Sequence, residues 1–183
     1  MEFSIKSGSP EKQRTACVVI GVFETRKLTL AGEMIDRVSE GYLSDILRRG
    51  DMEGKSDSTL LLHNVPNTLC DRVLLVGLGK ERDFRENEYR KAIRVAIKTL
   101  NETGSLEAVI YLTELGVKKR DITWHIEQAA MVAMEAVYRF DKLKSKQDEV
   151  RRPLRKLTLS VERRNEIAEA ESAVISGQAI AHG

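Results

Sequence analysis

Two apolar runs restrict the possible folds of this chain most strongly. ACVVIGVF covers residues 16–23 and DRVLLVGLG covers residues 71–79, and each run has the length of one strand. A strand that is apolar on both faces has to be covered on both, which is typical of a sheet enclosed between helices. The two runs therefore predict a central sheet with a helical layer on each side.

Four further segments predict strands around that centre. EFSIK (2–6) and LTLSV (157–161) alternate polar with apolar residues, whereas TLLLHN (59–64) and EAVIYLTEL (107–115) are short apolar runs. Alternation is typical of a half-buried strand. For residues 157–161 it predicts a strand at a sheet edge or a strand with one exposed face.

Three segments have apolar residues at helical spacing, namely residues 35–47, 89–100 and 122–137. Gly41 lies inside the first segment and can divide it in two. Asp121 is a suitable N-cap for the third. Because strands and helices alternate, we predict a three-layer α/β/α domain around a mixed sheet, filling residues 1–160.

The remaining residues, 161–183, are predicted to start a helix outside that domain. Small and apolar residues recur there at helical spacing: Ile167, Ala170, Val174, Gly177 and Ala181. The closing AIAHG is still apolar, with the final glycine as its only stop signal. This narrow face therefore needs a partner to pack against.

Known motifs for phosphate binding are incomplete in this chain. Gly77 and Gly79 follow a buried strand, but Arg82 occupies the position of the third glycine of a dinucleotide fingerprint. Gly54 precedes Lys-Ser as in a P-loop, but Arg49 stands where the first glycine of that motif belongs. Neither segment predicts a nucleotide site by itself.

Metal-ligand and nucleophile patterns are missing as well. His63, His125 and His182 are widely separated and fit no recognised ligand spacing. Cys17 and Cys70 lie in or beside apolar runs, which indicates two buried free thiols in a reducing cytosol. No apolar run approaches the length that spans a membrane. We therefore expect a cytoplasmic protein without a complete catalytic site in these residues.

Basic residues are clustered although the net charge is only +2. One cluster is Lys118, Lys119 and Arg120, and the other comprises Lys142, Lys144, Lys146, Arg151, Arg152, Arg155 and Lys156. Only two acidic residues, Asp148 and Glu149, lie within the second cluster. Such clusters bind nucleic-acid phosphates without reading the base sequence. A solvated loop that keeps the protein in solution is the alternative.

Four long segments give the chain a resemblance to a known family. They read MEFSIKSGSPEKQRTACVVIGVFE, LSDILRRGDMEGKSDSTLLLHNVPN, RVLLVGLGKERDF and RRPLRKLTLSV. In these segments, and along essentially its whole length, the chain resembles the N-terminal portion of bacterial leucyl aminopeptidases, also called cytosol aminopeptidases or aminopeptidase A. The resemblance implies a macro-domain-like α/β domain, followed by the helix that leads to a larger C-terminal peptidase domain. The small-residue face of that helix would then dock against this further domain.

The same resemblance implies how the work is divided in the whole protein. The catalytic residues and two divalent metal ions, Mn or Zn, would belong to the C-terminal domain, so residues 1–183 would carry no cofactor. The whole protein would be a homo-hexamer that removes N-terminal residues from peptides. Some bacterial members bind double-stranded DNA as recombination accessory factors or transcriptional repressors. The macro-domain likeness adds a nucleotide as a third ligand, with Gly77 and Gly79 as its phosphate contacts.

Overall fold

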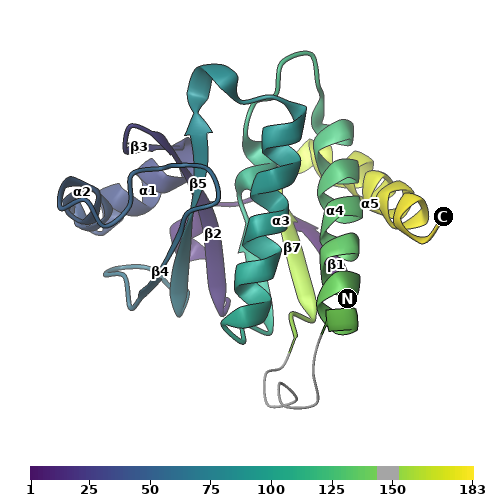
Figure 1. Ribbon diagram of the computed structural model, residues 1–183, viewed down its shortest axis with the longest axis horizontal. Coiled ribbons are helices and arrows are strands. Elements are labelled where there is room, and N and C mark those ends of the chain that lie inside the picture. Colours follow the sequence, from purple (N-terminus) through teal and green to yellow (C-terminus); the bar gives the residue numbers. More distant parts are fainter. Residues whose placement is uncertain (144–152) are drawn as a thin grey trace.

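The computed structural model describes residues 1–143 and 153–183. The strands are β1 (Glu2–Lys6), β2 (Cys17–Glu24), β3 (Lys27–Leu28), β4 (Thr59–His63), β5 (Arg72–Lys80), β6 (Glu107–Ile110) and β7 (Lys156–Ser160). The α-helices are α1 (Leu30–Val38), α2 (Tyr42–Arg48), α3 (Glu86–Glu102), α4 (Ile122–Leu143) and α5 (Ile167–His182). Helices lie on both sides of the sheet (Figure 1), so the predicted three-layer architecture is confirmed.

The sheet is mixed, as predicted, and its strand order is β1-β7-β6-β2-β5-β4. The first five strands of that order run parallel to one another, whereas β4 pairs antiparallel with β5 and the short β3 pairs antiparallel with β2. Parallel neighbours end at the same edge of the sheet. The carboxyl ends of β2, β5, β6 and β7 are therefore gathered at one edge, where α/β sheets usually bind ligands.

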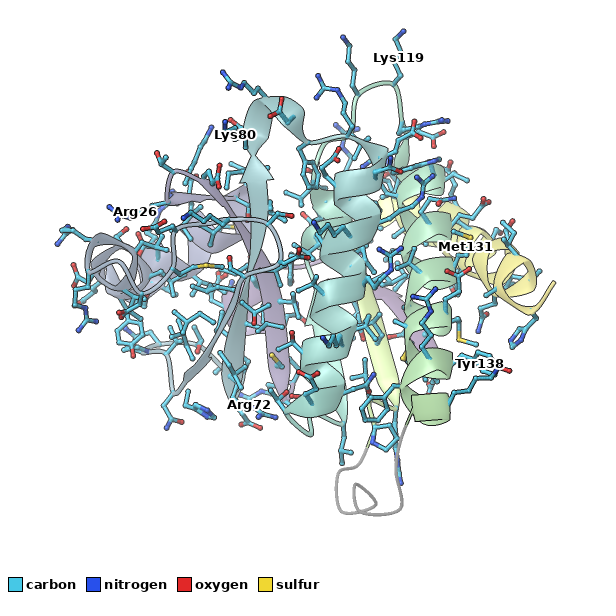
Figure 2. All side chains as sticks on the ribbon, in the orientation of Figure 1. Arg26, Arg72, Lys80, Lys119, Met131 and Tyr138 are labelled. Carbon is cyan, nitrogen blue, oxygen red and sulfur yellow. The ribbon has the colours of Figure 1, made fainter. Side chains whose placement is uncertain are left out.

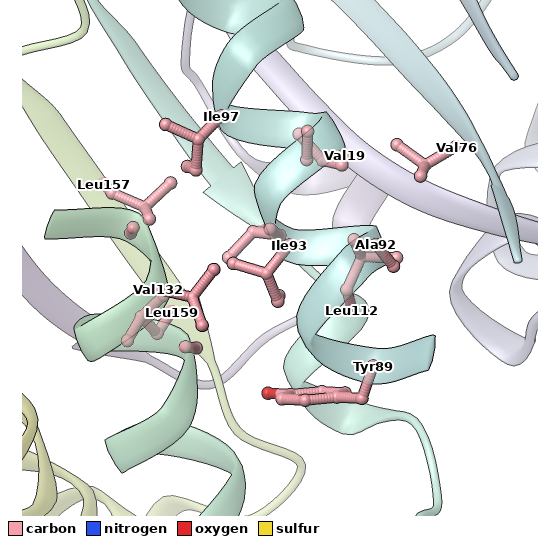
Figure 3. Packing of buried hydrophobic residues seen from close by; sticks show 14 of the residues in the cluster. Val19, Val76, Tyr89, Ala92, Ile93, Ile97, Leu112, Val132, Leu157 and Leu159 are labelled. Carbon is pink, nitrogen blue, oxygen red and sulfur yellow. The ribbon is translucent and has the colours of Figure 1, made fainter. Parts of the chain in front are cut away.

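Burial on both faces explains why β2 lies inside the sheet. Val19 and Phe23 pack under α3 and α4, while Val18, Ile20 and Val22 pack against α1 and α2. Figure 3 shows part of the first layer, in which α3 places Tyr89, Ile93 and Ile97 above β2, β6 and β7. Each side chain of β2 thus removes apolar surface from water on one side or the other.

Local signals explain where several helices begin and end. Gly41 adopts a positive φ of 84° and separates α1 from α2, at the position where the sequence allows a break. Trp124 N–H donates to Asp121 Oδ1 (2.9 Å), which confirms Asp121 as the capping residue of α4. Both predicted free thiols are buried, and burial raises the pKa of Cys17 to about 12.

Two predictions about strands are wrong. β7 is neither an edge strand nor exposed on one face, because it lies between β1 and β6 and its polar residues are buried. Thr158 and Ser160 are satisfied by distant partners: Thr158 Oγ1 lies 2.7 Å from Ser4 Oγ, and Ser160 Oγ donates to Glu114 Oε2. The strand predicted over 107–115 ends at Ile110 and continues as a 3₁₀ turn, Leu112–Glu114.

The small-residue face of the last helix has its partner inside this chain. Ala170, Ala173, Val174 and Gly177 of α5 are buried, and α5 packs along α4. A Cβ at Gly177 would collide with the backbone carbonyl of Glu127 and would lie 3.0 Å from Ala130 Cβ. The prediction that this face docks on a further domain is therefore wrong. The boundary at residue 160 stays a prediction.

This close helix packing can be tested at Gly177. We expect Gly177→Ala to lower the free energy of unfolding by about 1–3 kcal/mol, because its methyl group must push α5 away from a rigid backbone carbonyl. Alanine alone would favour the helix by about 1 kcal/mol, so a stabilised variant would contradict the close approach. The measurement is urea unfolding followed by Trp124 fluorescence.

Gly116→Ala is the matched control for that experiment. Its φ is not in the positive region, and an added Cβ there would meet nothing within 4 Å. The free energy of unfolding of this control should stay within about 0.5 kcal/mol of the unsubstituted chain.

Candidate functional site at the carboxyl edge of the sheet

A cleft of about 350 Å³ lies where the parallel strands end. β2 contributes Phe23, and the segments after β5, β6 and β7 contribute Glu81, Glu114 and Glu162. Lys27 and the start of α1 complete the lining from the opposite side. Four stretches that are far apart in sequence therefore meet in one cavity because their strands are parallel.

The floor of the cleft is apolar and rigid. The rings of Phe23 and Phe84 pack edge to face, with centroids 5.6 Å apart. Beside them, Tyr111 is buried and donates from its hydroxyl to Gly8 O (2.6 Å). Burial raises the pKa of Tyr111 above its usual range, so this hydroxyl stays protonated and fixes the loop before β2.

The rim of the cleft is acidic. Its charged residues are Lys27, Glu33, Glu81, Glu114 and Glu162. The single lysine is already paired, because Lys27 Nζ lies 2.7 Å from Glu81 Oε1. Burial raises the pKa of Glu114, and the neighbouring Glu162 carboxylate adds to the rise, whereas the hydrogen bond from Ser160 opposes it. An anionic ligand would meet a negative field in this cleft.

The predicted phosphate contacts are not available. Gly77 N–H donates to Ser58 O (2.8 Å), and Gly79 N–H donates to Gly54 O (2.9 Å). The segment around Lys55 packs directly over Gly77, where any side chain would collide with the Lys55 carbonyl. Both glycines allow this segment to pack closely on β5. Because their N–H groups already donate to the segment, these groups cannot also bind a phosphate.

The first basic cluster lies in the loop before α4, at its N-terminal end. Lys118 and Lys119 are exposed, and Figure 2 shows Lys119 at the tip of this loop. Arg120 is engaged within the fold instead. Its Nε donates to Glu86 Oε1 (2.8 Å), and its guanidinium lies 5.5 Å from the centroid of the Trp124 ring.

The second basic cluster belongs to the opposite end of α4. Lys142 lies in the last turn of the helix, with its Nζ 4.7 Å from the centroid of the Tyr138 ring. Arg155 is exposed just before β7, and Lys156 is half-buried at the start of β7. Four further members lie outside the described residues: Lys144, Lys146, Arg151 and Arg152.

The described members of the two clusters do not merge into one patch. α4 has 22 residues, so its ends are about 33 Å apart at 1.5 Å per residue. Figure 2 shows Lys119 and Tyr138 toward opposite ends of α4. A single ligand that touched both clusters would have to extend along the whole helix.

The described residues offer no metal centre. No three His, Cys, Asp or Glu side chains among them lie close enough together to hold an ion. His63 ends β4 at the surface and His182 ends α5. His125 is buried, with its Nδ1 2.6 Å from Asp121 O.

Comparison with known proteins decides the family. The family model for the N-terminal domain of the cytosol aminopeptidase family matches residues 19–147. The chain belongs to the cytosol aminopeptidase family. The probable cytosol aminopeptidase of Dechloromonas aromatica (strain RCB) is 68% identical to this chain over 183 residues. That match covers all of this chain and 37% of the relative, and the chain likewise spans 35% of the Chromobacterium violaceum protein.

Several solved structures have the same fold as this chain. A variant of tomato leucine aminopeptidase superposes with a TM-score of 0.72 at 16% identity, over all of this chain and 36% of that one. A macrodomain of Oceanobacillus iheyensis, solved with ADP, gives 0.62 at 10% identity, over 93% of this chain and 88% of that one. The expected macro-domain-like fold is therefore confirmed. No helix among the described residues is both long and apolar enough to cross a membrane.

The acidic rim was not among the residues singled out from the sequence. Its four glutamates are separated from one another by more than 30 residues along the chain. One signal was present, because Glu81 and Glu162 each follow the end of a predicted strand within a few residues. Glu114 lies inside the run predicted as a strand over 107–115, and only the earlier end of β6 at Ile110 places it after a strand. Only the parallel direction of those strands turns three separate strand ends into one acidic cleft.

The cleft chemistry predicts that ADP-ribose does not bind this domain. Because its diphosphate would face the acidic rim without free N–H donors at Gly77 and Gly79, we expect no change in melting temperature at millimolar ADP-ribose. A ligand at 100 times its dissociation constant would add about 2.7 kcal/mol of stability. A concentration-dependent rise in a thermal-shift assay would contradict this expectation.

Proposed function

We propose that these residues are the non-catalytic N-terminal domain of a metal-dependent leucyl aminopeptidase. One observation carries the proposal. The chain is 68% identical, from end to end, to a protein named a probable cytosol aminopeptidase, but spans only 37% of that protein. In this proposal the peptidase chemistry belongs to the portion of the longer protein that residues 1–183 do not include.

The whole protein would remove N-terminal residues, preferably leucine, from peptides in the cytoplasm during protein turnover. Two divalent ions, Mn or Zn, would be held by the C-terminal domain, where such ions activate water and polarise a carbonyl. The N-terminal domain would contribute to the homo-hexamer and to control of access to the active site. A rigid core with two enclosed faces suits such a scaffold role.

This assignment of the catalytic site predicts different peptidase activities for the longer protein and for the 183-residue chain. We expect the longer protein to hydrolyse leucine p-nitroanilide when supplied with Mn²⁺ or Zn²⁺, and the 183-residue chain to release no p-nitroaniline under the same conditions. The measurement is absorbance at equal molar concentration, with and without a chelator. Chelator-sensitive hydrolysis by the 183-residue chain would place a catalytic site in this domain and overturn the proposal.

Double-stranded DNA binding is a second candidate function, and the exposed lysines favour it. Lys118 and Lys119 project from the loop before α4, and neither has an ion-pair partner among the described residues. Unpaired exposed cations can release counterions from a phosphate backbone at little cost to the fold. With few phosphate contacts in one domain, the affinity should be weak unless several copies act together.

Charge reversal tests the two clusters separately. If the second cluster binds DNA, a variant with Arg151, Arg152 and Arg155 changed to glutamate should no longer bind labelled duplex DNA. The double variant Lys118→Glu and Lys119→Glu should flatten the plot of log affinity against log salt by about one for each lysine that binds a phosphate. Fluorescence anisotropy across a salt series measures both effects.

Arg37→Glu is the control for these reversals. Arg37 is exposed on α1, which covers the other face of the sheet. Its reversal should leave the salt dependence unchanged. Equal weakening by all variants would mean that only the total charge matters, and binding that no variant weakens would place the DNA interface elsewhere.

A further inference from the structure

The outer edge of β1 has free backbone groups. Glu2 N–H donates to Arg155 O (2.8 Å) at one end of β1, and Lys6 O accepts from Val161 N–H (2.9 Å) at the other. In a parallel pair, backbone groups of alternate residues face the same neighbour, so those of Ser4 also face β7. The N–H and C=O groups of Phe3 and Ile5 therefore point away from the sheet.

A groove of about 520 Å³ runs along this free edge. β1 lines one side with residues 1–5, and α5 lines the other with Glu171, Val174, Ile175 and Gln178. The helix lies next to α4 at the β1 end of the sheet (Figure 1) and contacts β1. It thus flanks the position that a strand added beyond β1 would occupy.

The exposure of Ile175 indicates that nothing in the described part of the domain covers the position beyond β1. Its side chain is 69% exposed, although the neighbouring Val174 is buried against the domain. An added strand would offer alternate side chains to Ile175 and would satisfy the backbone groups of Phe3 and Ile5. Apolar exposure and unpaired backbone groups are therefore found along one groove, and a single extended segment can remove both.

We infer that an extended segment from the remainder of the longer protein pairs with β1 in this groove. The inference rests on the proposed function, in which residues 1–183 belong to a longer peptidase. The chain spans 37% of its Dechloromonas aromatica relative, so most of the longer protein lies outside the structure. A segment in the same polypeptide has a high effective concentration at the groove, which favours it over a separate partner. Its residues facing α5 are apolar, to match Ile175.

Amide hydrogen exchange at single residues tests the inference. In the 183-residue chain, we expect the Phe3 and Ile5 amides to exchange fast, whereas in the longer protein they should slow by at least about tenfold. Ser4 and Lys6 are internal controls in the same strand, because their amides bond to β7 in both proteins. Equal exchange of Phe3 and Ile5 in the two proteins would overturn the inference.

Variants of the longer protein make the test independent of how the shorter chain behaves. Ile175→Asp should restore fast exchange at Phe3 and Ile5 while Ser4 and Lys6 stay protected. Ser172→Asp introduces the same charge on an exposed residue of α5 outside the groove lining and should leave all four amides unchanged. Protection that survives Ile175→Asp would overturn the inference.

Two other outcomes separate this inference from its alternatives. Protection of Phe3 and Ile5 in the 183-residue chain that rises with its concentration would assign the edge to a second copy and overturn the inference. Peptide hydrolysis by a longer protein whose Phe3 and Ile5 stay unprotected would leave the proposed function intact and refute the docking alone.

Discussion

The whole architecture depends on burial of β2 on both faces. Val18, Val19, Ile20 and Val22 are fully buried, yet they point alternately to opposite sides of the sheet. Neither helical layer alone could remove this strand from water, so α1 and α2 on one side are as necessary as α3 and α4 on the other. The neighbours of β2 run parallel to it, and their common direction creates the cleft at the carboxyl edge.

The sequence predicts the centre of this fold well because burial on both faces leaves an unmistakable apolar run. It predicts β7 poorly, because Thr158 and Ser160 look solvent-facing although both are buried. The partners of their side chains, Ser4 and Glu114, are more than forty residues away. Polar residues satisfied by such long-range bonds cannot be distinguished from exposed ones by alternation alone. The candidate site was hidden for a similar reason, since only the sheet topology assembles its acidic rim.

Likeness of fold and likeness of binding chemistry diverge in this domain. The superposition with a macrodomain extends over most of both chains, but the carboxyl edge of the sheet here has acidic side chains and no free N–H groups at Gly77 and Gly79. Gly77 allows the segment around Lys55 to pack on β5, and this packing removes the donors that a phosphate would need. A shared fold therefore fixes the strand geometry without fixing the groups that would bind a ligand.

The last helix shows that a small-residue pattern does not identify the partner on which a helix packs. A glycine and alanine face indicates close helix packing, but the pattern does not say which helix provides the partner. In the structure α4 takes that role, since Gly177 brings the backbone of α5 against Glu127. α5 therefore contributes its smallest residues to the domain and leaves Ile175, a large apolar residue, outside. Because large exposed side chains gain more from burial than small ones, a further segment would gain more stability on the outer side of α5 than on its small-residue face.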